Sequence, residues 1–253
     1  MVKLAKKIAL GFLIYLVFLV VLFPASMAVK LAPLPSNVTI SGVSGTIWAG
    51  SIDMLSVQKR QVEMITWDLN VLSLLTGTVK ADVVIGSRAS AVNGKGTIAY
   101  SMSGLDASGL RFEAPSSFLL GRTNLPFRTK INGDLSVLVD TFEQGLPWCE
   151  QLSGKLFLNQ VNVTNQFGKY PLGDIALGLA CLDGKVELTT DEKLNGLGLD
   201  GTIVLADQKM VQVNAKIREV NTQPDDLKKA LSFLGKKDSQ GYYPITYQGR
   251  LPI

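Results

Sequence analysis

The sequence contains no histidine and only two cysteines, Cys149 and Cys181. Without histidine it lacks the side chain that most often serves as a general base, a zinc ligand or a pH switch. Charged residues make up only 18% of the chain, and no run of lysine or arginine indicates a nucleic-acid surface. These absences argue against a histidine-dependent enzyme, a histidine-based metal site and a nucleic-acid-binding protein.

Catalysis by other residue types finds little support either. The carboxylate pair Asp225/Asp226 is predicted at the start of a helix and Asp191/Glu192 in a turn, so neither pair is expected to act as a general acid and base. No S-x-x-K pattern, which could supply a nucleophile and its base, opens a helix. The glycines fall at strand ends, where they serve turns and bulges, and they form no phosphate-binding loop. We therefore expect no catalytic, cofactor-binding or metal-binding residues and no enzyme activity.

The excess of positive charge lies at the N-terminus. The net charge is +4, of which Lys3, Lys6 and Lys7 supply a large part, and from Ile8 to Val29 no residue is charged. A helix crosses the hydrocarbon layer of a membrane in about 20 residues, and basic residues stay on the cytoplasmic side. The pattern predicts a single-pass inner-membrane protein whose following domain lies in the periplasm.

The alternative is a signal peptide cleaved after Ala28, because Ser26-Met27-Ala28 offers small residues at the right place. The apolar core from Ile8 to Phe23 is longer than the roughly 7–15 residues of such a segment, which favours the uncleaved anchor. Either reading exports the rest of the chain. The expected organisation is a cytoplasmic end at 1–7, a membrane span at 8–29, a linker at 30–37 and a periplasmic β domain at 38–253.

The exported part consists of short apolar alternations separated by Gly, Asn, Asp and Ser, the pattern of an antiparallel meander. In Ile65–Val71, for example, every second residue is apolar, so one face covers a core. So many strands cannot stay flat, and we expect an all-β domain built as a curved sheet or a sandwich. The predicted strands are Val38–Ile40, Gly42–Gly50, Ile52–Val57, Ile65–Val71, Thr78–Ile85, Gly94–Tyr100, Gly109–Glu113, Phe127–Ile131, Gly133–Val139, Gly154–Val163, Asp174–Leu179, Gly184–Thr189, Gly198–Ala206, Met210–Arg218 and Ile245–Leu251.

Short helices interrupt this pattern. Thr222 is a predicted cap for a helix that begins with Pro224 and two acids, has an apolar face from Leu227 to Leu234 and ends at Gly235. Further turns are expected at Leu72–Leu75 and between Leu138 and Leu152.

Cys149 and Cys181 are expected to pair in an oxidising periplasm. On the chain-entropy account the bond would stabilise the fold by roughly 3–4 kcal/mol. Trp148 is expected to pack on this disulfide, and Trp48 and Trp67 on apolar strand faces. An exposed strand edge is the feature most suited to recruit a partner, although the sequence does not indicate which edge.

Several segments resemble protein N of the bacterial type II secretion system along essentially the whole chain. One is the basic start with its apolar span; another is Gly42–Gly50, similar to the family's G-x-x-G-x-[LI]-W-x-G element with Gly45, Trp48 and Gly50 at its fixed positions. The segment Trp67–Gly77 is similar to W-x-L-x-P-x-x-L-x-x-G through Trp67, Leu69 and Gly77, with Val71 and Leu72 where a proline is often seen. The cysteine pair and the closing Gly241–Gly249 also fit.

The resemblance implies a non-enzymatic accessory component of the inner membrane, in a machine that exports folded proteins from the periplasm through an outer-membrane secretin. It implies contacts with other inner-membrane subunits and with periplasmic domains of the secretin, and it supplies no catalytic residues.

The rival hypothesis is a lipid-handling envelope protein of the AsmA/TamB kind, which also has one N-terminal anchor followed by a one-sided β-sheet rolled into an apolar groove. The two readings differ in whether the apolar face is filled by the chain's own side chains or is left for an acyl chain. Trp48, Trp67, the disulfide and the helix at Leu227–Leu234 are expected to fill it, which favours the scaffold reading.

Overall fold

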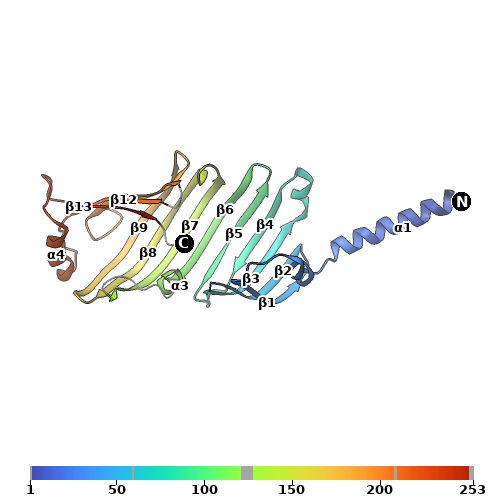
Figure 1. The fold of residues 1–253 in the computed structure, drawn as a ribbon, viewed down its shortest axis with the longest axis horizontal. Coiled ribbons are helices and arrows are strands. Elements are labelled where there is room, and N and C mark those ends of the chain that lie inside the picture. The colour runs from blue at the N-terminus through green and yellow to red at the C-terminus, as the bar shows by residue number, and fades with distance from the viewer. Residues whose placement is uncertain (1, 59, 121–127, 208–209, 251–253) are drawn as a thin grey trace.

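A computed structural model describes residues 2–58, 60–120, 128–207 and 210–250, with side chains from Lys6 onward. The chain forms one antiparallel sheet of 13 strands whose spatial order follows the sequence from β1 to β13 (Figure 1). The strands are β1 Val38–Gly45, β2 Ala49–Val57, β3 Arg60–Asn70, β4 Val79–Ile85, β5 Asn93–Ser101, β6 Gly104–Pro115, β7 Lys130–Gln144, β8 Cys149–Asn165, β9 Gly168–Leu182, β10 Lys185–Thr190, β11 Leu199–Leu205, β12 Met210–Ile217 and β13 Tyr243–Arg250.

The predicted all-β meander is thus confirmed, and the sheet curls without splitting into a sandwich. The long strands β7 and β8 pair with three register shifts, at Asn132/Asp134, Val139/Thr141 and Glu143/Gln144. Such bulges bend the strands and increase their twist, so a long ribbon of strands can curve. The predicted strands at Phe127–Ile131 and Gly133–Val139 form the single strand β7, which begins only at Lys130, so Arg128 and Thr129 precede it. Phe127 and Leu251 lie outside the described residues.

Helices are few and short apart from the first one. The helical elements are α1 Val2–Val21, α2 Ala25–Leu31, η1 Val71–Thr76, α3 Ser116–Leu120, α4 Asp225–Leu231 and η4 Ser232–Leu234. The turn expected at Leu72–Leu75 is therefore confirmed as η1, which Asn70 caps with its side-chain oxygen. In contrast, no helical turn forms between Leu138 and Leu152, where strands β7 and β8 run almost without interruption.

The cap predicted for the last helix was wrong. Pro224 occupies the N-cap position of α4, and no side chain caps the helix. Instead of capping it, the Thr222 hydroxyl donates a hydrogen bond of 2.6 Å to the Gly196 carbonyl and ties the helix to the loop after β10. Asp225 and Asp226 do occupy the first turn, where the helix dipole favours negative charge.

The apolar run at the N-terminus is divided. Helix α1 ends at Val21, and Pro24 stands at the N-cap of α2, so the run from Ile8 to Val29 is not one continuous helix. In the portion of the chain that the structure describes, no helix combines the length and apolar character required of a candidate membrane span. Helix α1 leaves the sheet at its β1–β2 end and points away from it (Figure 1).

The closed core lies at the C-terminal end of the sheet. Ile175, Leu177 and Leu197 form one buried cluster, and Ile217, Leu231 and Tyr243 form a second one. Leu227 of α4 packs against both clusters, and Leu231 is only 1% exposed. Helix α4 therefore covers the apolar face of β9 to β13 through Leu227 and Leu231, whereas Leu234 of the predicted stripe lies in η4 and is 45% exposed.

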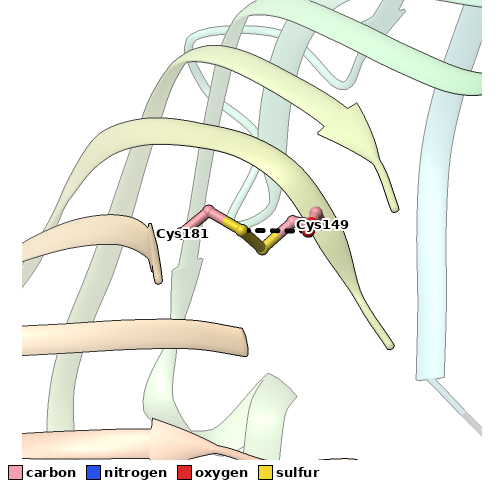
Figure 2. The surroundings of a disulfide bond; sticks show 2 residues. All are labelled: Cys149 and Cys181. Carbon is pink, nitrogen blue, oxygen red and sulfur yellow. Dashed lines mark hydrogen bonds between the residues drawn. A yellow bond between two sulfur atoms is a disulfide. The ribbon is translucent and has the colours of Figure 1, made fainter. Parts of the chain in front are cut away.

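The expected disulfide is present between Cys149 at the start of β8 and Cys181 near the end of β9, with Cα atoms 6.1 Å apart (Figure 2). Cys149 is 1% exposed. The neighbouring Trp148 lies in the β7–β8 connection, and its indole nitrogen donates a hydrogen bond of 2.8 Å to Ala206.

Candidate interaction surface

The residues of the two sequence motifs meet at the corner between β1, β2 and β3. Gly45 ends β1 with φ of +81°, and a Cβ there would lie 2.5 Å from the Ala49 carbonyl oxygen, so the tight turn requires glycine. The Thr46 side chain accepts hydrogen bonds from the backbone of Trp48 and Ala49 at 3.3 and 3.2 Å. These contacts fix the turn from Thr46 to Trp48.

Trp67 closes this corner from β3. Gly50 is its register partner across β2, and a Cβ at Gly50 would lie 2.4 Å from the Trp67 ring. The ring therefore packs directly on the glycine backbone, and its indole nitrogen donates a hydrogen bond of 3.1 Å to Ile47. Leu69 lies two residues further along the strand, and its backbone N–H donates to the Trp48 carbonyl at 2.6 Å.

Trp48 was expected on an apolar strand face, and this was wrong: it lies in the connection between β1 and β2. Its half-buried indole donates a hydrogen bond of 2.9 Å to the Val20 carbonyl in the last turn of α1. The Ile47 N–H donates to Phe23 at 3.1 Å, and Pro24 forms an antiparallel bridge with Thr46. The motif thus joins helix α1 to the sheet, and we call this set of contacts the anchor junction.

Gly77 belongs to the next connection at the same end of the sheet. It ends η1 with φ of +74°, and its N–H donates to the Leu74 carbonyl at 3.1 Å. The structure therefore brings Gly45, Trp48, Gly50, Trp67 and Leu69 into one cluster and places Gly77 separately.

A second feature is the open part of the apolar face. The molecule exposes 17020 Å², whereas a compact protein of 27.3 kDa exposes about 11,000 Å². The protruding helix and the uncovered sheet both contribute. On β4 to β6, the cross-strand neighbours Val79, Tyr100 and Leu105 are 45%, 61% and 37% exposed, and Ile98 on the same face is 37% exposed. The expectation that the chain's own side chains fill this face therefore holds at the end covered by α4 and at the corner closed by Trp67, but not on this part of β4 to β6.

A polar cluster lies on the closed lobe near α4. The Tyr242 hydroxyl donates a hydrogen bond of 2.6 Å to Glu192, which also pairs with Arg218. The hydrogen bond from Tyr242, aided by Arg218, lowers the pKa of the Glu192 carboxyl and in turn raises the pKa of Tyr242. Lys216 and Arg218 lie 4.6 and 5.3 Å from the Tyr242 ring centre. The cluster thus fastens the segment before β13 to the loop after β10.

Over the described ranges, no group of three or more His, Cys, Asp or Glu side chains is placed to hold a metal ion. The polar cluster is satisfied internally by its own hydrogen bonds and ion pair. What the structure offers is surface for binding: an open apolar face, the free edge of β13 and the end of the sheet at the anchor junction.

Sequence reasoning missed one set of residues at that end. Leu72 and Leu75 of η1, Met102 after β5 and Leu146 after β7 are 75%, 86%, 104% and 94% exposed. The signal was available, because the connections that contain them hold no Asp, Glu, Lys or Arg. It becomes visible only when the strand order shows that these connections share one end of the sheet.

The family comparison and the comparison with individual proteins point to the same family. A family model described as "Type II secretion system (T2SS), protein N" matches residues 36–246. Type II secretion system protein N from Aeromonas hydrophila is 33% identical over 246 residues, covering 96% of this chain and 97% of that protein. The protein of the same name from Vibrio cholerae is 28% identical over 233 residues, and that from Pectobacterium carotovorum is 22% identical over 241 residues, with 92% and 94% of each chain covered. No solved structure matches the chain significantly.

Proposed function

The chain belongs to the type II secretion system protein N family, and on this premise we propose that it is a non-enzymatic accessory subunit of the secretion machine, held in the inner membrane by its N-terminal helix. The sheet domain lies in the periplasm and acts through contacts with other inner-membrane subunits and with periplasmic domains of the secretin. The observation that carries the proposal is the family match over nearly the whole chain, on a fold whose exposed features are binding surfaces.

Support for the anchor comes from helix α1 itself. The large apolar side chains from Ile8 to Val21 are each 40–65% exposed. Phe12, Leu13 and Phe18, for example, are 61%, 58% and 60% exposed. Apolar surface of this extent is unfavourable in water and is stabilised in a lipid bilayer. The anchor junction then ties the end of this helix to the first hairpin of the sheet, which supports a domain held close to the membrane surface.

Support for protein contacts comes from the sheet edge. Strand β13 pairs only with β12, so one side of its backbone has no neighbouring strand in the described chain. An edge with free N–H and C=O groups can accept a strand from a partner protein. The exposed side chains of Thr246 and Gln248 on this strand leave it accessible.

The open apolar face favours a second candidate function, lipid handling. Exposed Val79, Ile98 and Tyr100 on that face can receive an acyl chain from a phospholipid. This candidate needs no partner strand at β13.

In-cell photocrosslinking distinguishes the two functions. The crosslinking residue is placed at Gln248 on the edge of β13, at Ile98 on the open face, and at Val84, an exposed residue on the other face of β4, as a control. Secretion subunits captured at Gln248, together with loss of secretion when the chain is absent, support the scaffold. Phospholipid captured at Ile98 with no protein captured at any position would replace it with lipid handling.

A further inference from the structure

One end of the sheet carries no charge along its first four connections. Because consecutive strands are antiparallel, every second connection lies at the same end of the sheet. The connections at 46–48, 71–78, 102–103 and 145–148 share this end and contain no Asp, Glu, Lys or Arg. We call these four connections the uncharged rim.

The opposite end of the same strands differs. Its connections include Arg88 between β4 and β5 and Arg128 between β6 and β7. Beyond β8 both ends carry charge, with Asp183 between β9 and β10 at the end of the uncharged rim and Asp191, Glu192 and Lys193 between β10 and β11 at the other end. It also carries exposed Phe167, so exposed apolar side chains alone do not distinguish the two ends. The distinguishing property is the combination of apolar exposure with a complete lack of charge over four successive tips.

The exposed side chains of the uncharged rim are large. Leu72, Leu75, Met102 and Leu146 are at least 75% exposed, which is unusual for residues that water solvates poorly. A hollow of about 660 Å³ lies among these tips, lined by Val79, Tyr100, Met102, Gln144 and Leu146. The open apolar face therefore continues onto this rim.

The first of these tips is the anchor junction. Trp48 of the 46–48 connection donates its hydrogen bond to Val20 of α1, and Pro24 bridges to Thr46. The first tip of the rim thus lies against the end of the apolar helix, and the other three follow it along the sheet. Charged groups are costly in the hydrocarbon layer of a bilayer, whereas Trp and Tyr are enriched where this layer meets the headgroups. A rim that lacks charge, exposes Leu and Met and carries Trp48, with Tyr100 of β5 beside it, matches the chemistry of that boundary.

Resting on the proposed membrane anchor, we infer that the uncharged rim lies against the lipid surface, with Leu72, Leu75, Met102 and Leu146 inserted among the lipid headgroups. The sheet is then held against the bilayer at several points along its rim. The opposite end, with its charged loops, faces the aqueous periplasm, and the hollow at Tyr100 opens at the membrane surface.

Spin labelling of the full chain tests this inference. The protein is reconstituted in vesicles of phosphatidylethanolamine and phosphatidylglycerol, and single cysteines are introduced by Leu75→Cys, Met102→Cys and Leu146→Cys. The native cysteines are in the disulfide and do not take the label without reductant. Ala89→Cys, exposed at the opposite end, is the matched control, and Leu13→Cys reports on helix α1. Collisions of each label with oxygen and with a water-soluble nickel chelate measure its depth.

The inference predicts an oxygen-to-nickel collision ratio several times higher at the three rim positions than at Ala89, in vesicles but not in a lipid-free polymer. If Leu13→Cys lies in the bilayer while the rim labels collide with nickel as freely as Ala89→Cys does, the rim inference is overturned and the anchor stands. If Leu13→Cys is itself exposed to nickel, the anchor proposal is overturned and the inference with it. Protection of the rim labels that rises with protein concentration at constant lipid indicates self-association and also overturns the inference.

Discussion

The indole nitrogen of Trp48 donates a hydrogen bond of 2.9 Å to the carbonyl oxygen of Val20, across 28 residues of sequence. It joins the last turn of α1 to the first turn of the sheet, at a point where the Ile47 N–H also donates to Phe23. Helix and sheet are therefore fixed by short-range contacts at one corner and not by a linker alone.

Replacing Trp48 by Phe keeps an aromatic ring and removes the donor. We expect the angle between helix and sheet to become more variable, and stability to fall by about 0.5–1.5 kcal/mol, the net contribution of one hydrogen bond. Pulsed electron–electron distances between labels on α1 and on β3 would broaden. Trp148→Phe is the matched control, because its indole donates to Ala206 at a different corner. Equal broadening in both variants would contradict a specific role of Trp48.

Gly50→Ala should destabilise the same corner by steric overlap. A Cβ there would lie 2.4 Å from the Trp67 ring, and overpacking of this kind costs about 1–3 kcal/mol. Chemical denaturation measures the loss, and Gly11→Ala, with nothing within 4 Å of its Cβ, serves as the control. In a double-mutant cycle with Trp67→Leu the alanine should cost less, because the overlap with the ring is removed while the Ser44 carbonyl oxygen, 2.7 Å from the added Cβ, remains. Strict additivity would rule out the overlap with the ring.

How far the sequence determined this architecture depends on the range of the contacts. Alternation in segments such as Ile65–Val71 predicted the strands, and the glycines between them predicted a meander, because both signals are local. The role of Trp48 could not be predicted, since its partner Val20 is 28 residues away and is a backbone carbonyl with no sequence signature. The prediction that Thr222 caps the helix failed for a similar reason. Its hydroxyl donates to the carbonyl of Gly196, in a loop distant in sequence that competes with the helix end for this hydrogen bond.

Removing the disulfide by the double change Cys149→Ser and Cys181→Ser should lower the free energy of unfolding by about 3–4 kcal/mol under oxidising conditions, because the unfolded chain regains the freedom of the closed loop. With reductant present, parent and variant should unfold at similar denaturant concentrations. Measuring both proteins in both conditions separates loss of the bond from loss of packing at the buried Cys149. A difference that persists in reductant would assign the effect to packing.

The polar cluster predicts a pH dependence of stability. Because Tyr242 holds the pKa of Glu192 below its ordinary value of 4.5, this carboxylate stabilises the fold above that value. The contribution is lost as the pH falls through the lowered pKa. Tyr242→Phe removes the hydrogen bond and should move the pKa of Glu192 upward, measured by carbon NMR of the carboxyl group.

Glu192→Gln should likewise flatten the decline of stability between pH 5 and the acid transition, with the exposed Glu63→Gln on β3 as the matched control. The opposite sign, a decline that steepens in Glu192→Gln, would contradict the assigned shift.

Two exported truncations separate the membrane anchor from the fold. A chain that begins at Leu22 behind a cleavable signal keeps Phe23, Pro24 and the Ala25 side chain, which is 2% exposed. It should fold with its stability lowered only by the loss of the Trp48–Val20 hydrogen bond, and it should fail to support secretion because the apolar helix is missing. A chain that begins at Val29 also loses the contacts with Thr46 and Ile47, so it should melt at a lower temperature. Normal secretion by the first chain would show that the anchor is dispensable, whereas equal melting of both would show that the junction adds nothing to stability.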